Sequence, residues 1–193
     1  MARNSLTQYL GECWLNTGLA YLILKNILGI KRKPSHCGGI TRCLSTAKKM
    51  LTMPRSLKIK LLVVDYEKAP KHALMLGEFI KNFNCTNTCQ DTGASSKSSF
   101  HINVYLCRDD LLLVTLRGSP EDVLSELDPG FRRHLSNPRI KRMFKNYKIY
   151  SEALGISDKL SINTDCNEFA SIIHRGLCIL YKEVAKAINR CSS

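Results

Sequence analysis

The chain contains few of the residues that break up a fold. It has 11 Gly and 6 Pro among 193 residues, which is too few for a low-complexity or collagen-like protein. The hydrophobic fraction of 44% is too high for an intrinsically disordered chain. We therefore expect a folded protein, and residues 1–193 fit a single domain, since one domain commonly holds roughly 150–200 residues.

Long apolar segments are also missing. The longest candidate, residues 19–30, is interrupted by Lys25 and Asn26, and it is shorter than the roughly 18 residues that a membrane-spanning helix needs. The first residues, Met1 to Asn4, are not followed by an apolar segment with a small-residue cleavage pattern, so we expect no secretory signal. The sequence predicts a protein without a membrane span.

Acidic residues are scarce, with 16 Asp and Glu against 29 Lys and Arg and a formal net charge of +13. Such an excess favours a negatively charged partner. Residues 132–148 contain no acid, and Lys141, Lys145 and Lys148 fall on one face of a helix expected over residues 138–147. We predict a nucleic-acid-binding surface that binds phosphates without reading sequence, formed by Arg139, Lys141, Arg142, Lys145 and Lys148. The alternative is a solvated helix face on a basic protein.

The chain has 9 cysteines, and an odd number without a signal segment favours free thiols in a reducing compartment. We expect a cytoplasmic or nuclear protein, or one of the host cytoplasm or virion if its source is viral. Cys85 and Cys89 lie close together in a polar segment, but a structural zinc site usually has two such pairs. Cys37, Cys43 and His36 are poorly spaced for the second pair. We therefore predict unlinked loop thiols, no metal and no cofactor.

The order of expected elements is typical of an α+β protein. The two strands over 100–107 and 111–116 are joined by a short polar connection, which predicts a hairpin. Ser119 followed by Pro120 indicates the start of a helix. The other helices are expected over 13–28, 40–53, 70–83, 138–147 and 166–188, and a further strand over 57–66. The domain would have a helical part (1–56), a sheet part (57–118) and a basic, helical C-terminal part (119–193).

Cys13 stands at the start of the first expected helix. A thiolate there meets unpaired N–H groups and the positive end of the helix dipole, which lower its pKa. Acyl transfer also needs donors for the developing oxyanion, and the Cys13 backbone N–H and the Gln8 side chain are candidates. Trp14 would pack behind the nucleophile, and Asn16 would brace the helix start by hydrogen bonding. The alternative is an ordinary small buried cysteine.

The segment Cys13-Trp14-Leu15-Asn16 resembles the picornaviral leader proteases. It is also similar to the ubiquitin-specific proteases, which begin with Leu-Gly, then Cys, an aromatic residue and Asn. Both families belong to the papain-like cysteine protease group. The resemblance implies a papain-like fold with the nucleophile on the first helix, packed on a small antiparallel sheet. It gives the oxyanion role to the residue five positions before the cysteine, where this chain has Gln8 in place of Asn.

The same resemblance implies a histidine at the start of a strand and an acid or amide at the end of the next. His101 opens the expected strand after the polar segment and fits the first position. The end of the next strand holds no acid. Asp122 is a candidate for orienting the histidine, but it is equally explained as an acid in the first turn of a helix. A dyad of Cys13 and His101 is therefore an open alternative.

Together these features predict a cysteine peptidase that cleaves peptide or isopeptide bonds. A virus is one expected source. Cys13 would be the nucleophile and His101 the base and then the acid. The expected substrate is a protein or polyprotein, with ubiquitin or a ubiquitin-like protein as a further candidate. The alternative is a catalytically inactive papain-like protein, or an unrelated basic nucleic-acid-binding or virion-associated interaction protein. The missing acid and the net charge favour that alternative.

Overall fold

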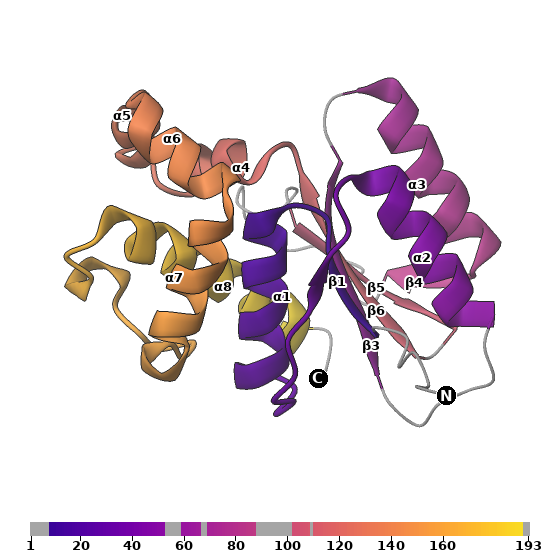
Figure 1. The fold of residues 1–193 in the computed structure, drawn as a ribbon. Helices are drawn as coiled ribbons and strands as arrows, with labels where there is room; N and C mark the ends of the chain where they lie inside the picture. Colours follow the sequence, from indigo (N-terminus) through magenta and orange to yellow (C-terminus); the bar gives the residue numbers. More distant parts are fainter. Residues whose placement is uncertain (1–7, 53–58, 67–68, 88–101, 109, 191–193) are drawn as a thin grey trace, which may run out of the picture.

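The computed structural model describes residues 8–52, 59–66, 69–87, 102–108 and 110–190. These residues form a sheet with helices on both faces (Figure 1). The strands are β1 (Tyr9–Gly11), β2 (Ser35–His36), β3 (Lys60–Tyr66), β4 (Cys85–Asn87), β5 (Ile102–Cys107) and β6 (Leu111–Arg117). The first helices are α1 (Trp14–Asn26), α2 (Ile40–Thr52) and α3 (Pro70–Asn82). The C-terminal helices are α4 (Pro120–Leu127), α5 (Phe131–Leu135), α6 (Pro138–Lys145), α7 (Tyr147–Ile156) and α8 (Ile172–Arg190).

The sheet has 6 strands in the order β2-β1-β3-β6-β5-β4. Strands β2, β1, β3 and β6 are parallel neighbours, and only β5 runs antiparallel to β6 and β4. The α+β composition is confirmed, but the small antiparallel sheet expected in the middle of the chain is wrong. The physical reason is that helical connections such as α1 and α2 return the chain to the same end of the sheet, which makes neighbouring strands parallel.

The residues of β3 alternate between two cores. Leu61 and Val63 pack with α1 and the C-terminal helices, whereas Leu62 and Val64 pack with α2 and α3. Successive side chains of a strand point to opposite faces, so β3 is apolar on both sides because both faces are covered. Figure 1 shows α2 and α3 on one side of the sheet and α1 with α7 and α8 on the other.

The chain changes face between β1 and β3. The helix after β1 is α1, which covers the first face, and the helix after β3 is α3, which covers the second. In open α/β sheets, a crevice forms outside the carboxyl ends of two neighbouring strands whose following helices leave on opposite faces. The residues that follow β1 and those that end β3 therefore occupy the position where such a sheet usually binds its ligand.

Two expected helices differ from those observed. The helix expected over 138–147 ends at Lys145, and Asn146 starts α7 by accepting a hydrogen bond from the backbone N–H of Lys148 at 2.8 Å. Asn is a strong helix-capping residue, and here it separates α6 from α7. Likewise, the helix expected over 166–188 is observed as α8 from Ile172, and the residues before it form a short 3₁₀ turn, Cys166–Glu168, that Asp165 caps.

Six of the described cysteines form disulfides, namely Cys37–Cys43, Cys85–Cys107 and Cys166–Cys178. The prediction of free thiols is therefore wrong for these six cysteines, and with it the unlinked loop thiol expected at Cys85. Cys85 lies in β4 directly opposite Cys107 in β5, and the sequence did not indicate this pairing because β4 falls in the segment expected to be a loop. Cys89 lies outside the described residues, and the reducing compartment stays a prediction. Among the helices that the structure describes, none is long and apolar enough to cross a membrane.

Candidate functional site

Cys13 is the N-cap of α1, directly after β1. Its Sγ accepts a hydrogen bond from the backbone N–H of Asn16 at 3.4 Å. The hydroxyl of Thr17 donates to the Cys13 carbonyl at 2.8 Å. Gly11 allows β1 to pass close to α1, because a Cβ at that position would lie 2.3 Å from the Thr17 backbone nitrogen. The expected placement of Cys13 at the start of a helix is thus confirmed, and the thiol is held at the carboxyl end of β1.

Asp65, near the end of β3, places a carboxylate oxygen within 4.8 Å of this thiol. It is 8% exposed, and its Oδ1 accepts a hydrogen bond of 2.6 Å from the side-chain nitrogen of the fully buried Asn16. Asn16 therefore connects the first turn of α1 to the neighbouring strand, which agrees with the bracing role expected for it. Asp65 was not among the predicted site residues, although an acid that ends an otherwise apolar strand is a recognisable signal.

The electrostatic surroundings raise the pKa of the Cys13 thiol far above its ordinary value. Burial is the largest cause, and the negative charge of Asp65 adds to it. The backbone N–H of Asn16 lowers this pKa, as expected at a helix start, but it does not outweigh the other two effects. The described residues therefore hold a neutral thiol, which is the opposite of the thiolate that the helix position alone predicts.

One cluster of metal-ligating atoms lies at this point of the described chain. The Sγ of Cys13 and carboxylate oxygens of Glu12 and Asp65 lie within 4.8 Å of one another. Thiolate and carboxylate are both ligand types that Zn²⁺ accepts, and three protein ligands leave a position for water. These residues could hold a divalent cation, but carboxylates gather on protein surfaces without one as well. The predictions of no metal and no cofactor stay predictions.

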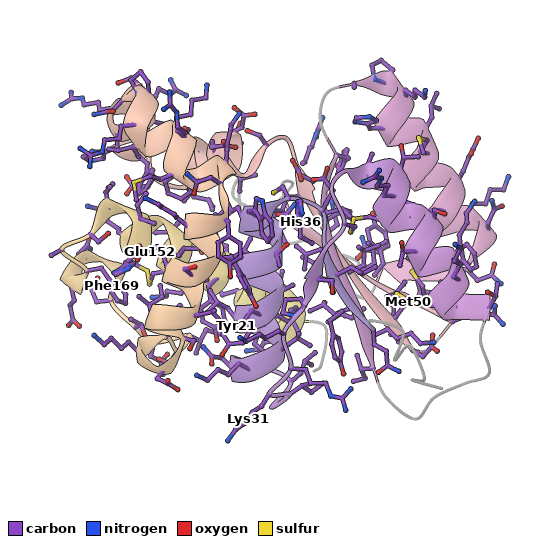
Figure 2. The ribbon with its side chains drawn as sticks, in the orientation of Figure 1. Tyr21, Lys31, His36, Met50, Glu152 and Phe169 are labelled. Atoms are coloured by element: carbon purple, nitrogen blue, oxygen red, sulfur yellow. A yellow bond between two sulfur atoms is a disulfide. The ribbon has the colours of Figure 1, made fainter. Side chains whose placement is uncertain are left out.

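His36 ends β2 and lies beside the start of α1 (Figure 2). The His36 ring stacks on the Trp14 ring, with 4.1 Å between the ring centroids. Tyr147 contacts the same Trp14 ring edge-on, with 4.9 Å between centroids. Burial lowers the pKa of His36 and so favours the neutral ring. Trp14 thus forms an aromatic cluster next to Cys13. The sequence did not assign this role to His36, because the two-residue strand that positions it has no readable periodicity.

Of the other predicted catalytic residues, the structure describes Gln8 and Asp122, and neither is placed to act with Cys13. Gln8 precedes β1, and its carbonyl pairs with the backbone N–H of Leu61. Because a strand rises about 3.3 Å per residue, the length of β1 separates Gln8 from Cys13, so Gln8 is not placed as the oxyanion donor. His101 lies outside the described residues.

Asp122 is engaged at the start of α4. Its carboxylate accepts hydrogen bonds from the backbone N–H of Ser119 at 3.2 Å and from the Ser119 hydroxyl at 3.0 Å. In return, the Ser119 hydroxyl accepts from the backbone N–H of Asp122. This is a capping box, so the first-turn explanation of Asp122 is the one observed. Its predicted role of orienting a histidine has no support in these contacts.

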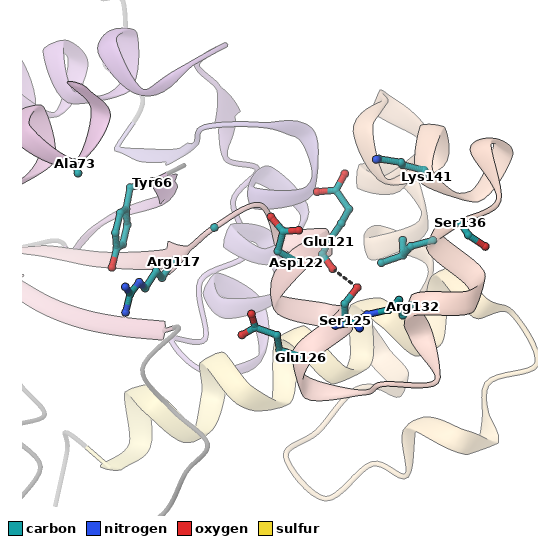
Figure 3. A pocket seen from close by; sticks show the side chains of 12 residues that line it. Tyr66, Ala73, Arg117, Glu121, Asp122, Ser125, Glu126, Arg132, Ser136 and Lys141 are labelled. Carbon is teal, nitrogen blue, oxygen red and sulfur yellow. Dashed lines mark hydrogen bonds between the residues drawn. The ribbon is translucent and has the colours of Figure 1, made fainter. Parts of the chain in front are cut away.

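A pocket of about 1040 Å³ lies at the same edge of the sheet, beyond the ends of β3 and β6. Tyr66 and Arg117 line it from the strand ends, and α4 lines it with Glu121, Asp122 and Glu126. Figure 3 shows these α4 side chains with Arg132, Ser136 and Lys141, which come from α5, α6 and the turn between them. Its volume suits a small ligand or part of a peptide, and Tyr66 directly follows Asp65 in the chain.

The predicted basic surface is exposed but is not one helical face. Arg139, Lys141, Arg142 and Lys145 are exposed on α6. Lys148 is exposed as well, but it belongs to α7, so the expected alignment of Lys148 with Lys141 and Lys145 on one helix is wrong. Lys145 also forms an ion pair of 3.7 Å with Glu121, which offsets part of its charge.

No protein-family model, curated protein or solved structure matches the chain. The likeness to the papain-like group therefore depends on the short segment around Cys13 alone. Any function has to be argued from the site itself.

Proposed function

We propose that the chain is a cysteine-type hydrolase of peptide or isopeptide bonds, with Cys13 as its nucleophile. One observation carries the proposal, namely the position of Cys13 at the N-terminus of α1 and at the carboxyl ends of β1 and β3. Helix N-H groups there can stabilise negative charge on the thiolate and on an oxyanion. The pocket of about 1040 Å³ on the same edge offers room for substrate.

The raised pKa of Cys13 sets a requirement for this chemistry. A neutral thiol is a poor nucleophile, so a base has to remove its proton as the sulfur attacks the carbonyl carbon. His101 is the proposed base, and it would then give the proton to the leaving amine. Water would hydrolyse the resulting thioester and regenerate the thiol. The oxyanion donors would be backbone N–H groups at the start of α1, in place of Gln8.

The substrate of this proposed hydrolase is a protein, a polyprotein or a ubiquitin-like tail. Asp65 is proposed as a positioning residue, because it holds Asn16 and with it the first turn of α1. The papain-like relationship is proposed on the Cys13 to Asn16 segment alone. A fold in which the nucleophile begins a helix beside a mixed sheet can host the same chemistry, since catalytic groups recur on unrelated folds.

The test is hydrolysis of a fluorogenic peptide library and of ubiquitin carrying a C-terminal fluorophore. We expect Cys13→Ala and His101→Ala each to lower kcat/KM by about a thousandfold or more, as loss of a nucleophile or base does. His134→Ala is the matched control, because His134 is exposed on α5, and it should keep full activity. Hydrolysis that persists in Cys13→Ala would overturn the proposal.

Nucleic-acid binding is the second candidate function. Four exposed cations on α6 and Lys148 on α7 favour it, because phosphate binding depends on accessible positive charge and not on a cleft. It is compatible with the first proposal, since Cys13 lies outside the basic surface, although Lys141 belongs to that surface and also lines the pocket. It is equally compatible with an inactive interaction protein that only binds nucleic acid.

A further inference from the structure

The pocket beyond β3 and β6 contains a buried carboxylate that no described group hydrogen-bonds. Glu121 is 8% exposed, and its Oε1 has no hydrogen-bond partner. Lys145 approaches this atom at 3.7 Å, which is beyond hydrogen-bond distance, and the Lys145 side chain is itself 60% exposed. A buried carboxylate without a hydrogen bond is unfavourable. A ligand that donates a strong hydrogen bond to Glu121 would therefore gain binding free energy.

Neighbouring groups do not meet this need. The hydroxyl of Ser125 donates to the Glu121 backbone carbonyl at 2.9 Å and not to its carboxylate, as Figure 3 shows. Asp122 beside it uses its own carboxylate to cap α4. Glu121 is therefore the buried acid of the pocket that a ligand can still engage.

The charges in the pocket are arranged by depth. The buried charge is the carboxylate of Glu121, whereas Arg117, Arg132 and Lys141 line the pocket as exposed residues. A suitable ligand presents a cation to the interior and hydrogen-bond acceptors to the rim. A peptide segment with a basic side chain has both, since its backbone carbonyls accept hydrogen bonds. A guanidinium suits the carboxylate best because it can form two parallel hydrogen bonds with it.

We propose that this pocket binds a peptide through an arginine side chain whose guanidinium pairs with Glu121, while Arg132 and Lys141 contact acceptors of the flanking peptide. As a statement about substrate recognition, the inference rests on the proposed hydrolase function, because the pocket would then hold the residue that directs a substrate toward Cys13. As a statement about binding, it can be measured without any reaction.

The test uses the full chain carrying Cys13→Ala, which cannot form an acyl-enzyme. Two fluorescein-labelled hexapeptides of glycine and aspartate are compared by fluorescence anisotropy, one with a central arginine and one with citrulline, which has the same shape without the charge. We expect the arginine peptide to bind at least tenfold more tightly. Adding Glu121→Gln should remove most of this preference, and Glu121→Asp, which keeps the charge but shortens the side chain, should reduce it less.

Glu126→Gln is the matched control, because it removes the same charge from an exposed residue of the same helix that lines the same pocket. It should change the preference by less than threefold. Equal binding of the two peptides would overturn the inference, and so would an equal effect of Glu126→Gln and Glu121→Gln, which would indicate only a general charge effect. Displacement of the peptide by a DNA oligonucleotide with no dependence on Glu121 would also overturn it and assign the rim to nucleic acid.

Thermal melts of each variant separate misfolding from loss of binding. If Glu121→Gln does not fold, the comparison of arginine with citrulline on Cys13→Ala and the Glu121→Asp variant still decide the outcome. Failure of the hydrolase proposal is recognised separately. In that case the unmodified chain shows no hydrolysis, or the hydrolysis persists in Cys13→Ala, while the preference for the arginine peptide remains.

Discussion

Two opposing influences act on the thiol of Cys13. The N–H groups at the start of α1 favour the thiolate, and the Asn16 N–H contacts the sulfur directly. Burial and the carboxylate of Asp65 favour the neutral form and prevail. If Cys13 is a nucleophile, its resting state is therefore protected from alkylation and oxidation, because only the thiolate reacts quickly.

Asp65→Asn should make Cys13 more reactive. The substitution removes the second largest cause of the raised pKa, while the new side-chain oxygen can still accept the hydrogen bond from Asn16. A lower pKa gives a larger thiolate fraction at a fixed pH below that pKa. We expect iodoacetamide at pH 8, with EDTA present to remove metal, to label Cys13 about tenfold faster, which corresponds to one pKa unit. Labelling is followed by peptide mass spectrometry.

Asp158→Asn is the control for this experiment, because Asp158 is exposed and pairs with Lys25. It removes the same charge and should leave the labelling rate unchanged. An unchanged rate in Asp65→Asn would mean that burial alone keeps the thiol neutral, and Asp65 would then have only its positioning role.

Gly11→Ala should strongly destabilise the protein. The added Cβ would lie 2.3 Å from the backbone nitrogen of Thr17, and backbone cannot rotate away as a side chain can. We expect the free energy of unfolding in urea to fall by about 3 kcal/mol or more, in the range of severe overpacking. Gly77→Ala on α3 is the matched control, since its Cβ would meet nothing within 4 Å, and alanine favours a helix by about 1 kcal/mol. Similar losses in both variants would contradict the close approach of β1 to α1.

Strong local signals in the sequence were sufficient to predict individual helices and strands. The hairpin of β5 and β6 and the Ser119 cap of α4 are confirmed, because turn chemistry and capping depend on neighbouring residues. Strands β1 and β2 escaped prediction, since their three and two residues are too short to show alternation. The parallel pairing of β1 with β3 is a long-range contact that periodicity does not contain.

The same distinction applies to the site. The position of Cys13 at a helix start follows from local pattern and is confirmed. Its neighbour Asp65 comes from β3, and His36, which stacks on the adjacent Trp14, comes from β2. Only the strand order brings these two residues to the start of α1. The role given to Gln8 rested on its place five residues before Cys13, and sequence spacing alone does not show that the intervening residues form a strand.

The break between α6 and α7 changes what the basic surface should do. Lys141 and Lys145 share α6, whereas Lys148 lies beyond the Asn146 cap. We expect the double variant Lys141→Gln, Lys145→Gln to weaken binding of a DNA duplex and to reduce the slope of log K against log salt by about one to two units, since each phosphate contact contributes about 0.9. Titrations at several salt concentrations measure both effects.

Lys148→Gln should have the smaller effect, and Lys81→Gln, an exposed lysine on α3, should have none. An equal effect of Lys81→Gln and the double variant would show that only the net charge of +13 attracts DNA. A dominant effect of Lys148→Gln would contradict the separation of the two helices.

Across the whole molecule, the two edges of the sheet have different chemistry. The carboxyl edge carries the thiol of Cys13, the carboxylate of Asp65 and the pocket with the buried carboxylate of Glu121. At the amino end of β3, Lys60 is 3% exposed and donates to the Met50 carbonyl at 2.8 Å and to Asp110 at 2.5 Å. One ammonium group thus connects α2, β3 and the turn between β5 and β6.

Asp110→Asn should lower the free energy of unfolding by about 3 kcal/mol, because it leaves the buried ammonium of Lys60 without its counter-charge. The double variant Lys60→Met, Asp110→Leu should lose much less, since removing both charges also removes the cost of burying them. Urea unfolding at neutral pH measures both variants, and Asp158→Asn controls for the loss of an exposed pair. If the double variant is as unstable as Asp110→Asn, the packing of these side chains and not their charge holds the amino edge.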